Sequence, residues 1–229
     1  MNSEGFRLSP QQRRLWALGG GVEGFPYRLV ARIEYQGRLD GKELERRLRD
    51  LAARYEILRT SFRRSSSSSA PVQIISAEPA ITVEEHDLGH LASDAQQTGI
   101  DSRIREVRQA PIDVARDPLL KLVRFDLGAQ HCQLLISAHA LCMDRASLEI
   151  LAEELFDGEV STDDAGTRGE PLQYVDVAEW QSEWLESEEA APGREHWRCF
   201  DPVNARELVL PSEITPTVGG FDPCRIRLP

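Results

Sequence analysis

Two stretches of the chain alternate between apolar and polar positions with the period of a β-strand. Residues 29–35 place leucine, alanine, isoleucine and tyrosine on one side and arginine and glutamate on the other. Residues 131–138 alternate in the same way, and a Gly128-Ala129-Gln130 turn separates them from a second apolar run at 119–127. This pattern predicts a strand at 29–35 and a hairpin over 119–138.

Other stretches carry the spacing of amphipathic helices. Ser9 precedes Pro10 as a helix N-cap, and helical stripes follow over about 44–55, 92–109, 144–155 and 172–188. On the last of these, Trp180 and Trp184 lie on the apolar side and are predicted to pack in the core or at an interface. Strands and helices mix in a βαβ and ββα order, which favours an α/β two-layer sandwich, a mixed β-sheet with helices packed on one face.

Composition and charge narrow the class of protein. The 229 residues are 41% hydrophobic and 28% charged, with a net charge of −11. Residues 1–64 hold 14 basic and 8 acidic side chains, whereas the rest is strongly acidic. The acidic majority argues against nucleic acid binding. The basic stretch is either a solvated helix face or a surface for an acidic partner.

The sequence offers no signal for secretion or membrane insertion. No apolar run approaches the roughly 20 residues of a membrane helix, and the first residues lack an apolar signal core. Four widely spaced cysteines are too few for a disulfide framework. We therefore expect a cytoplasmic protein that does not bind membranes.

The segment 137–147 runs from an apolar strand through a turn into a helix, with His139 at the strand end and Asp144 at the helix start. A zinc site built from His131, Cys132, His139 and Cys142 is not expected, because their spacing matches no zinc pattern. Nothing in the sequence assigns a base to Cys142 as a nucleophile. We expect no metal and no directly bound cofactor.

The same segment resembles the HHxxxDG motif of the condensation domains of nonribosomal peptide synthetases. His139 fills the first histidine and Asp144 the aspartate. Ala140 stands where that family has its reactive histidine, and Arg145 replaces the glycine. The motif is therefore degenerate at its reactive position.

Three further stretches resemble the same family and follow in the same order. Residues 8–16 are similar to LSxxQxRLW, residues 54–62 to RHExLRTxF with Tyr55 for the histidine, and residues 174–181 to YxDxAxWQ. His196-Trp197 resembles a following YW pair. The resemblance spans nearly the whole chain, but only the N-terminal half of such a domain.

The resemblance implies a fold and a domain organisation. Condensation domains have two lobes similar to chloramphenicol acetyltransferase, with the reaction tunnel between them. We expect residues 1–200 to form the N-terminal lobe. Residues 201–229 would be the crossover segment toward an absent C-terminal lobe.

The resemblance also implies a chemistry. In the family, an acceptor amine attacks a donor thioester, both carried on phosphopantetheine arms, and the second histidine positions or deprotonates the amine. A positioned general base contributes about 10²–10⁴-fold, and Ala140 has no proton acceptor. We expect a lobe of a peptide or hybrid peptide–polyketide synthetase that is inactive alone. It would be a scaffold or docking surface for a peptidyl or acyl carrier protein, a C-terminal lobe or an adjacent adenylation domain.

Alternative roles for the motif residues stay open. His139 either supports the local structure or replaces the missing base. Asp144 either pairs with Arg59, as the resemblance implies, or simply caps its helix. Arg145 either narrows the site or points to solvent.

Three alternative activities also remain. The chain could be a fragment of an active condensation domain with an unusual site, forming an amide bond between carrier-bound acyl and aminoacyl thioesters. It partly fits the DxxxxDxxS pattern of heterocyclisation domains, where Asp144 and Ser147 match but His139 replaces the first aspartate. A trimeric acyltransferase of the chloramphenicol acetyltransferase type is the third, with His139 as its histidine.

Overall fold

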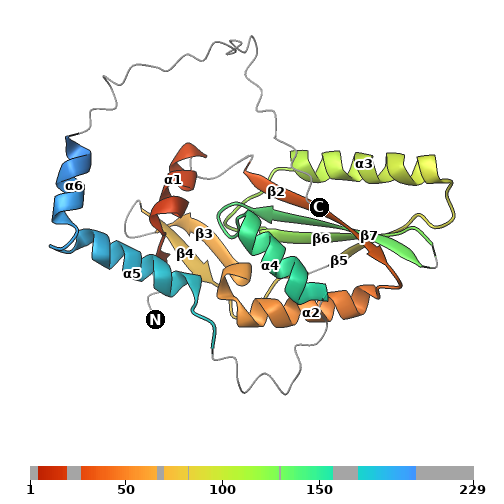
Figure 1. Ribbon diagram of the computed structural model, residues 1–229, viewed down its shortest axis with the longest axis horizontal. Coiled ribbons are helices and arrows are strands. Elements are labelled where there is room, and N and C mark those ends of the chain that lie inside the picture. The colour runs from red at the N-terminus through yellow and green to blue at the C-terminus, as the bar shows by residue number, and fades with distance from the viewer. Residues whose placement is uncertain are drawn as a thin grey trace, which may run out of the picture. The chain divides into compact units, whose positions relative to one another are not determined.

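The computed structural model describes residues 5–19, 27–65, 70–81, 83–128, 130–156 and 170–199. The chain divides into two compact units, Met1–Ser187 and Glu188–Pro229. Figure 1 shows the elements. Residues 201–229, predicted as a crossover segment, lie outside the described residues.

The strands of the first unit form two sheets. The smaller sheet has the order β1-β4-β3 and is antiparallel throughout, and the larger has the order β2-β7-β6-β5. In the larger sheet β5 and β6 run parallel while the other neighbours are antiparallel, so it is mixed as predicted. The strands are β1 (Phe6–Arg7), β2 (Arg28–Gln36), β3 (Thr60–Arg64), β4 (Pro71–Ile75), β5 (Val83–Asp87), β6 (Leu120–Asp126) and β7 (His131–His139).

The helices lie near the ranges predicted from the apolar spacing. In the first unit they are α1 (Pro10–Leu18), α2 (Gly41–Arg54), the short 3₁₀ helix η1 (Glu56–Arg59), α3 (Ser93–Gln109), α4 (Arg145–Phe156) and α5 (Tyr174–Glu186). The described part of the second unit holds α6 (Ala191–Arg198). Within the described ranges, no helix has both the length and the apolar character needed to cross a membrane.

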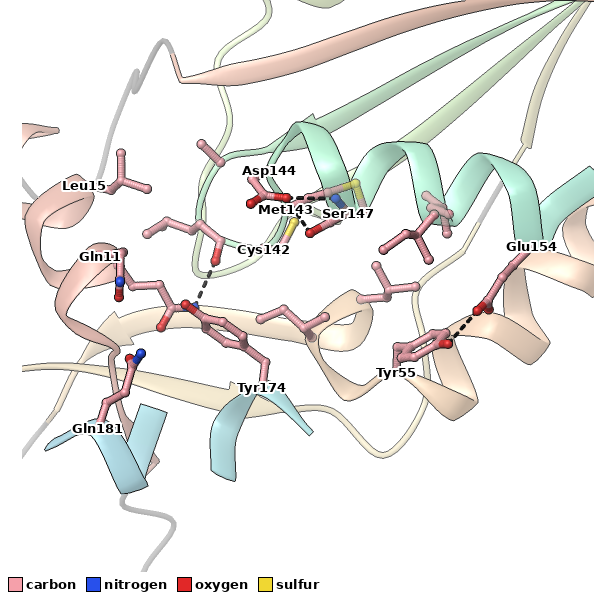
Figure 2. A pocket seen from close by; sticks show the side chains of 17 residues that line it. Gln11, Leu15, Tyr55, Cys142, Met143, Asp144, Ser147, Glu154, Tyr174 and Gln181 are labelled. Carbon is pink, nitrogen blue, oxygen red and sulfur yellow. Dashed lines mark hydrogen bonds between the residues drawn. The ribbon is translucent and has the colours of Figure 1, made fainter. Parts of the chain in front are cut away.

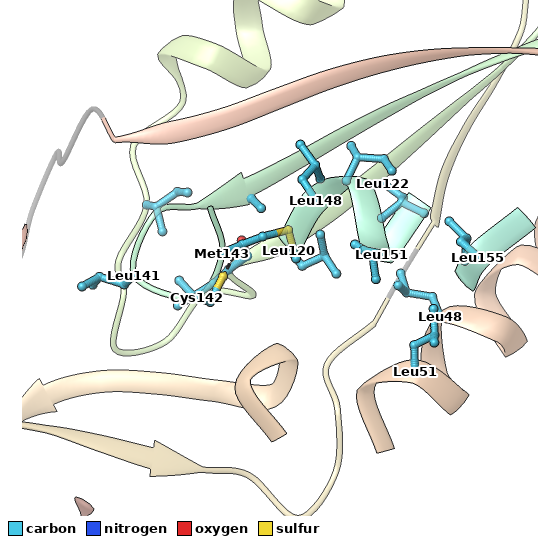
Figure 3. Close-up of a cluster of buried hydrophobic side chains, with 14 of the residues drawn as sticks. Leu48, Leu51, Leu120, Leu122, Leu141, Cys142, Met143, Leu148, Leu151 and Leu155 are labelled. Atoms are coloured by element: carbon cyan, nitrogen blue, oxygen red, sulfur yellow. Dashed lines mark hydrogen bonds between the residues drawn. The ribbon is translucent and has the colours of Figure 1, made fainter. Parts of the chain in front are cut away.

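The main core lies between one face of the larger sheet and helices α2 and α4. Leu134 and Ile136 of β7 belong to the same buried cluster as Leu48 of α2 and Leu151 of α4. Figure 3 shows the leucines of α2, β6 and α4 converging on this core.

The opposite face of the larger sheet is covered as well, by α3. Ile100 and Val107 pack with Val123, Phe125 and Leu135 in a second buried cluster. Helices thus lie on both faces of this sheet, as Figure 1 shows, rather than on one. The physical reason is that β6 and β7 carry apolar side chains on both faces, as central strands do.

Three of the 14 basic residues in 1–64, namely Arg46, Arg47 and Arg49, form ion pairs along α2. Arg46 bonds to Glu43 at 2.8 Å and to Asp50 at 2.7 Å, and Arg49 pairs with Glu45. Their spacing of three or four residues places each pair on neighbouring turns of the exposed helix surface. The arrangement is that of a solvated helix face.

Candidate functional site

A cavity of about 620 Å³ lies in the first unit, beside the turn that links β7 to α4. The lining residues come from α1, η1, α4, α5 and the loop 140–144. Each of the four stretches singled out in the sequence therefore contributes to the lining of this cavity. Figure 2 shows these side chains around the opening. The volume is within the range of about 300–1,000 Å³ typical of small-molecule sites.

The first stretch forms the N-terminus of α1, which is hydrogen-bonded to both the loop 140–144 and α5. Ser9 and Gln12 form a reciprocal capping box. Ser9 Oγ accepts a hydrogen bond from the Gln12 backbone N–H at 3.2 Å, and Gln12 Oε1 accepts one from the Ser9 backbone N–H at 2.9 Å. Gln12 Nε2 remains to donate to the Leu141 carbonyl at 2.9 Å. The hydroxyls of Ser9 and Tyr174 hydrogen-bond at 2.8 Å. These contacts fix the loop and α5 to α1.

The second stretch supplies a polar pair at another side of the cavity. Tyr55 Oη donates to Glu154 Oε1 of α4 at 2.7 Å, as Figure 2 shows. Arg54 Nη1 lies 3.8 Å from the other carboxylate oxygen, Oε2. Tyr55 therefore connects η1 to α4 at the cavity wall.

His139 ends β7 and is fully buried, with 0% of its surface exposed. The ring Nδ1 accepts a hydrogen bond from the Leu141 backbone N–H at 3.1 Å, and the His139 backbone N–H donates to the Leu119 carbonyl at 2.8 Å. Burial lowers the pKa of the ring to about 4, and the nearby Arg28 charge lowers it as well. The imidazole is thus neutral at pH 7, and it is not among the described residues that line the cavity.

Ala140 is the next residue and does line the cavity. Its N–H donates to the Tyr27 carbonyl at 2.9 Å, which continues the pairing with the segment before β2 for one more residue. Successive side chains of an extended chain point to opposite faces, so burial of His139 directs the Ala140 methyl group the other way. A methyl group cannot accept a proton from a ligand in the cavity.

Asp144 caps α4, and Arg59 bonds elsewhere. Asp144 Oδ1 accepts from the Ser147 N–H at 2.8 Å and from Ser147 Oγ at 2.6 Å, and these bonds lower the pKa of the Asp144 carboxyl. Arg59 pairs with Glu56 at 3.0 Å and donates to the Ser76 carbonyl. The structure shows no pair between Arg59 and Asp144, which the resemblance implied, because the Arg59 guanidinium bonds to Glu56 and to the Ser76 carbonyl instead.

Arg145 is exposed at the start of α4, whereas Cys142 lines the cavity. Arg145 Nε donates to Glu149 at 3.0 Å, and 55% of the Arg145 side chain is exposed to solvent. Cys142 is buried and its Sγ donates to the His139 carbonyl, and burial raises the pKa of the thiol to about 12. It is therefore a protonated thiol at neutral pH. Within the described ranges, no three His, Cys, Asp or Glu side chains lie close enough together to hold a metal.

Sequence reasoning gave no individual role to Gln12 and Gln181, which lie in the quoted stretches, and did not consider Glu154, although all three line the cavity. A signal for Glu154 was available, because it follows Ser147, Ile150 and Leu151 at helical spacing and so shares their face of α4. Gln12 donates a hydrogen bond to the Leu141 carbonyl, which is far along the chain, and a local sequence pattern cannot predict this contact.

Comparison with known proteins identifies the family. The family model described as "Condensation domain" matches residues 2–228, and the chain belongs to this family. It is 31% identical over 216 residues to a linear gramicidin synthase of Brevibacillus parabrevis, covering 90% of this chain and 3% of that protein. It is 30% identical over 195 residues to gramicidin S synthase 2 of Brevibacillus brevis, covering 84% and 4%. These matches confirm the family expected from the four stretches.

Solved structures agree on the fold. SgcC5 from Streptomyces globisporus matches with a TM-score of 0.66 and 26% identity, covering 84% of this chain and 45% of that chain. The X-domain in complex with OxyB from teicoplanin biosynthesis matches with a TM-score of 0.73 and 23% identity, covering 95% and 48%. The chain thus spans about half the length of these structures and a small part of the synthetases, and the α/β fold class is confirmed.

Proposed function

We propose that this chain is a condensation-domain lobe of a nonribosomal peptide or hybrid peptide–polyketide synthetase, and that it provides no general base for amide formation. Its role is then that of a scaffold or docking surface. The observation that carries the proposal is the Ala140 methyl group in the wall of the cavity, at the position where the family motif has its second histidine.

The neighbouring groups support the proposal because none of them replaces the histidine. His139 is enclosed by protein and its Nδ1 is already bonded to the Leu141 N–H, so we infer a structural role for it. Asp144 is held by Ser147, and its lowered pKa makes it a weak base at neutral pH.

The partners follow from the family rather than from the site. We propose a peptidyl or acyl carrier protein as the docking partner, with the thioester end of its phosphopantetheine arm entering the cavity and the phosphate staying at the carrier protein. A C-terminal condensation lobe or an adjacent adenylation domain would complete the assembly.

A condensation assay with loaded carrier proteins tests the proposal, using the synthetase that contains this chain. The native protein should form no amide product. Ala140→His should gain product, because the imidazole restores an acceptor within the cavity. Amide formation by the native protein at rates like those of active domains would refute the docking role.

A matched variant separates basicity from shape. Ala140→Asn adds a polar side chain of smaller size that is not a base at neutral pH. It should gain no product, and its melting temperature should match that of Ala140→His. Equal gains in both variants would show that filling the space, not proton transfer, matters.

The alternative is an active condensation domain with an unusual site, and the retained cavity favours it. Positioning two reactants contributes to rate without a base, and a volume of about 620 Å³ is enough to hold a substrate group. Product formation by the native synthetase that is lost on Asp144→Ala would favour this alternative.

A further inference from the structure

We propose that the outer edge of β2 is a docking surface for a second copy of this chain, so that two lobes share one continuous β-sheet. The two β2 strands pair antiparallel about a two-fold axis at Ile33. This register places Arg32 of each copy opposite Glu34 of the other. The proposal does not depend on whether the lobe forms amide bonds.

β2 is the longest strand at an edge of either sheet. It runs for nine residues without a proline, against five for β5 at the other edge of the same sheet. Among the described residues β2 pairs with β7 alone. The edges of the smaller sheet are protected, because the Arg7 N–H of β1 donates to Glu179 at 2.6 Å and the Phe62 N–H of β3 donates to the Val114 carbonyl at 2.9 Å. A long edge strand is a template for pairing with another chain.

The hydrogen bonds to β7 determine which backbone groups of β2 point outward. The Gly37 N–H donates to the Gln130 carbonyl, and the Ala140 N–H donates to the Tyr27 carbonyl, both at 2.9 Å. Opposite residues of an antiparallel pair alternate between bonded and non-bonded pairs, so the odd-numbered residues of β2 bond to β7. The N–H and C=O groups at the outer edge therefore belong to Arg28, Val30, Arg32, Glu34 and Gln36.

A two-fold axis at Ile33 brings these outward groups of two copies into register. It places Arg32 opposite Glu34 of the second copy, and Val30 opposite Gln36. Each such pair exchanges two backbone hydrogen bonds, and the opposite charges attract. An axis at Arg32 or at Glu34 would place two like charges directly opposite each other, which is unfavourable. The charges of β2 thus select a register for pairing.

An axis at Ala31 is disfavoured by the contacts of Arg28. This axis would place Glu34 opposite Arg28, whose guanidinium already donates to the Ala110 carbonyl at 2.8 Å. Glu34 itself is available at the edge, because 62% of its side chain is exposed and the Arg32 guanidinium of its own chain is 3.6 Å away. The axis at Ile33 uses this carboxylate and leaves the bond of Arg28 intact.

The same pairing covers apolar side chains on the core face of β2. Four of them pack against the main core but stay partly exposed, namely Leu29, Ala31, Ile33 and Tyr35. With the axis at Ile33, the two Ile33 side chains meet and Ala31 lies opposite Tyr35. Cross-strand apolar pairs of this kind stabilise a sheet, so the dimer buries surface that a single lobe leaves in water.

The cavities of the two lobes lie away from the axis. Ala140, which lines the cavity, bonds to Tyr27. Tyr27 lies six residues before Ile33, or about 20 Å along an extended strand. Because the pairing is antiparallel, the two cavities lie at opposite ends of the shared edge.

Sedimentation velocity of the 229-residue protein at concentrations from about 5 to 500 µM tests the proposal. The mass should rise from the 25.7 kDa of one chain toward twice that value. The dissociation constant should be about 10–100 µM, as expected for a small interface. A monomer at every concentration would overturn the proposal. Association beyond a dimer would also overturn it, because a two-fold contact closes on itself.

Charge reversal tests the register. Arg32→Glu and Glu34→Arg each place like charges opposite each other, and each should weaken the dimer by about tenfold or more. The double variant restores opposite charges at the native net charge and should recover the native dissociation constant. Matching melting temperatures would show that the variants are folded. A double variant that associates no better than the single ones would refute this register.

A matched control addresses the other exposed apolar surface. Trp180→Ser changes a side chain of α5 that is 62% exposed, and it should associate as the native protein does. Association that is lost in Trp180→Ser but unchanged by the charge reversals would assign the contact to α5 and overturn the proposal.

Amide hydrogen exchange measured by NMR locates the contact on the strand. The outward amides of Val30, Arg32 and Glu34 should exchange more slowly in the dimer than at dilution. The amides of Ala31 and Ile33, which bond to β7, should be protected at both concentrations. Equal exchange of the Arg32 amide in both samples would mean that this edge is either already bonded within one chain or never paired, and either result refutes the proposal.

Discussion

Lowering the pH tests the burial of His139, which we expect to make the protein less stable in mild acid. Above pH 6.5 the ring is neutral in both the folded and the unfolded chain, and it contributes no pH dependence. Between pH 6.5 and 4 the unfolded chain takes up a proton that the folded state excludes, so the free energy of unfolding falls as the pH falls. Below pH 4 both states are protonated and the decrease stops.

The magnitude follows from the two pKa values. An ordinary value of 6.5 and a folded value of about 4 give a total loss of about 3 kcal/mol, at about 1.4 kcal/mol for each tenfold change. About 2 kcal/mol of this loss falls between pH 7 and pH 5. The side chain is fully buried, so solvent screening does not reduce the effect.

Urea unfolding followed by tryptophan fluorescence at pH 7, 6 and 5 measures the effect, with His139→Asn as the reference. The asparagine oxygen can accept the Leu141 N–H in place of Nδ1 but does not titrate. Carboxylates common to both proteins cancel in the difference. The native protein should lose about 2 kcal/mol more than the variant between pH 7 and pH 5. Parallel pH profiles for the two proteins would refute the burial of a neutral ring.

Substitutions at three further residues have expected outcomes in thermal and urea unfolding. Asp144→Ala removes the carboxylate that accepts the Ser147 backbone N–H at the start of α4, and it should destabilise the protein by about 1 kcal/mol. Asp144→Asn should lose much less stability, because asparagine also accepts this bond as an N-cap. Gln12→Leu leaves the Leu141 carbonyl without its donor and opens the capping box, so we expect a loss of about 1–3 kcal/mol. Arg145→Ala removes an exposed side chain and should change stability by less than about 0.5 kcal/mol. A larger loss for Arg145→Ala than for Asp144→Ala would contradict the geometry of this turn.

Much of the fold could be predicted from the sequence because the signals are local. The alternation over 29–35 and 131–138 predicted β2 and β7. The turn at Gly128 is also a local signal, because its φ of 134° is a backbone conformation that favours glycine whatever the neighbours are. Cover on both faces of the larger sheet was missed, because α3 carries its apolar side chains at few positions in a polar helix. The division into two sheets depends on pairing partners distant in sequence.

The site could be predicted in part. The segment around Ala140 and Asp144 lines a cavity within this lobe, and the tunnel between two lobes that the resemblance implied stays a prediction. The partner of Arg59 could not be predicted, since Glu56 and Asp144 are both plausible acceptors until the fold sets the distances. Of the two places predicted for Trp180 and Trp184, the core is wrong and an interface stays a prediction: the two side chains are 62% and 47% exposed, because α5 packs through its opposite face.

The pairing of β2 with β7 affects how the chain folds during synthesis. Arg28 and Ser137, which hydrogen-bond across these strands, are 109 positions apart, so β2 leaves the ribosome long before its partner exists. The exposed Arg32 and Glu34 of β2 oppose aggregation through this strand before β7 pairs with it. Because closing so long a loop is entropically unfavourable, we expect the turn at Ala140 to be among the last parts of the lobe to become ordered.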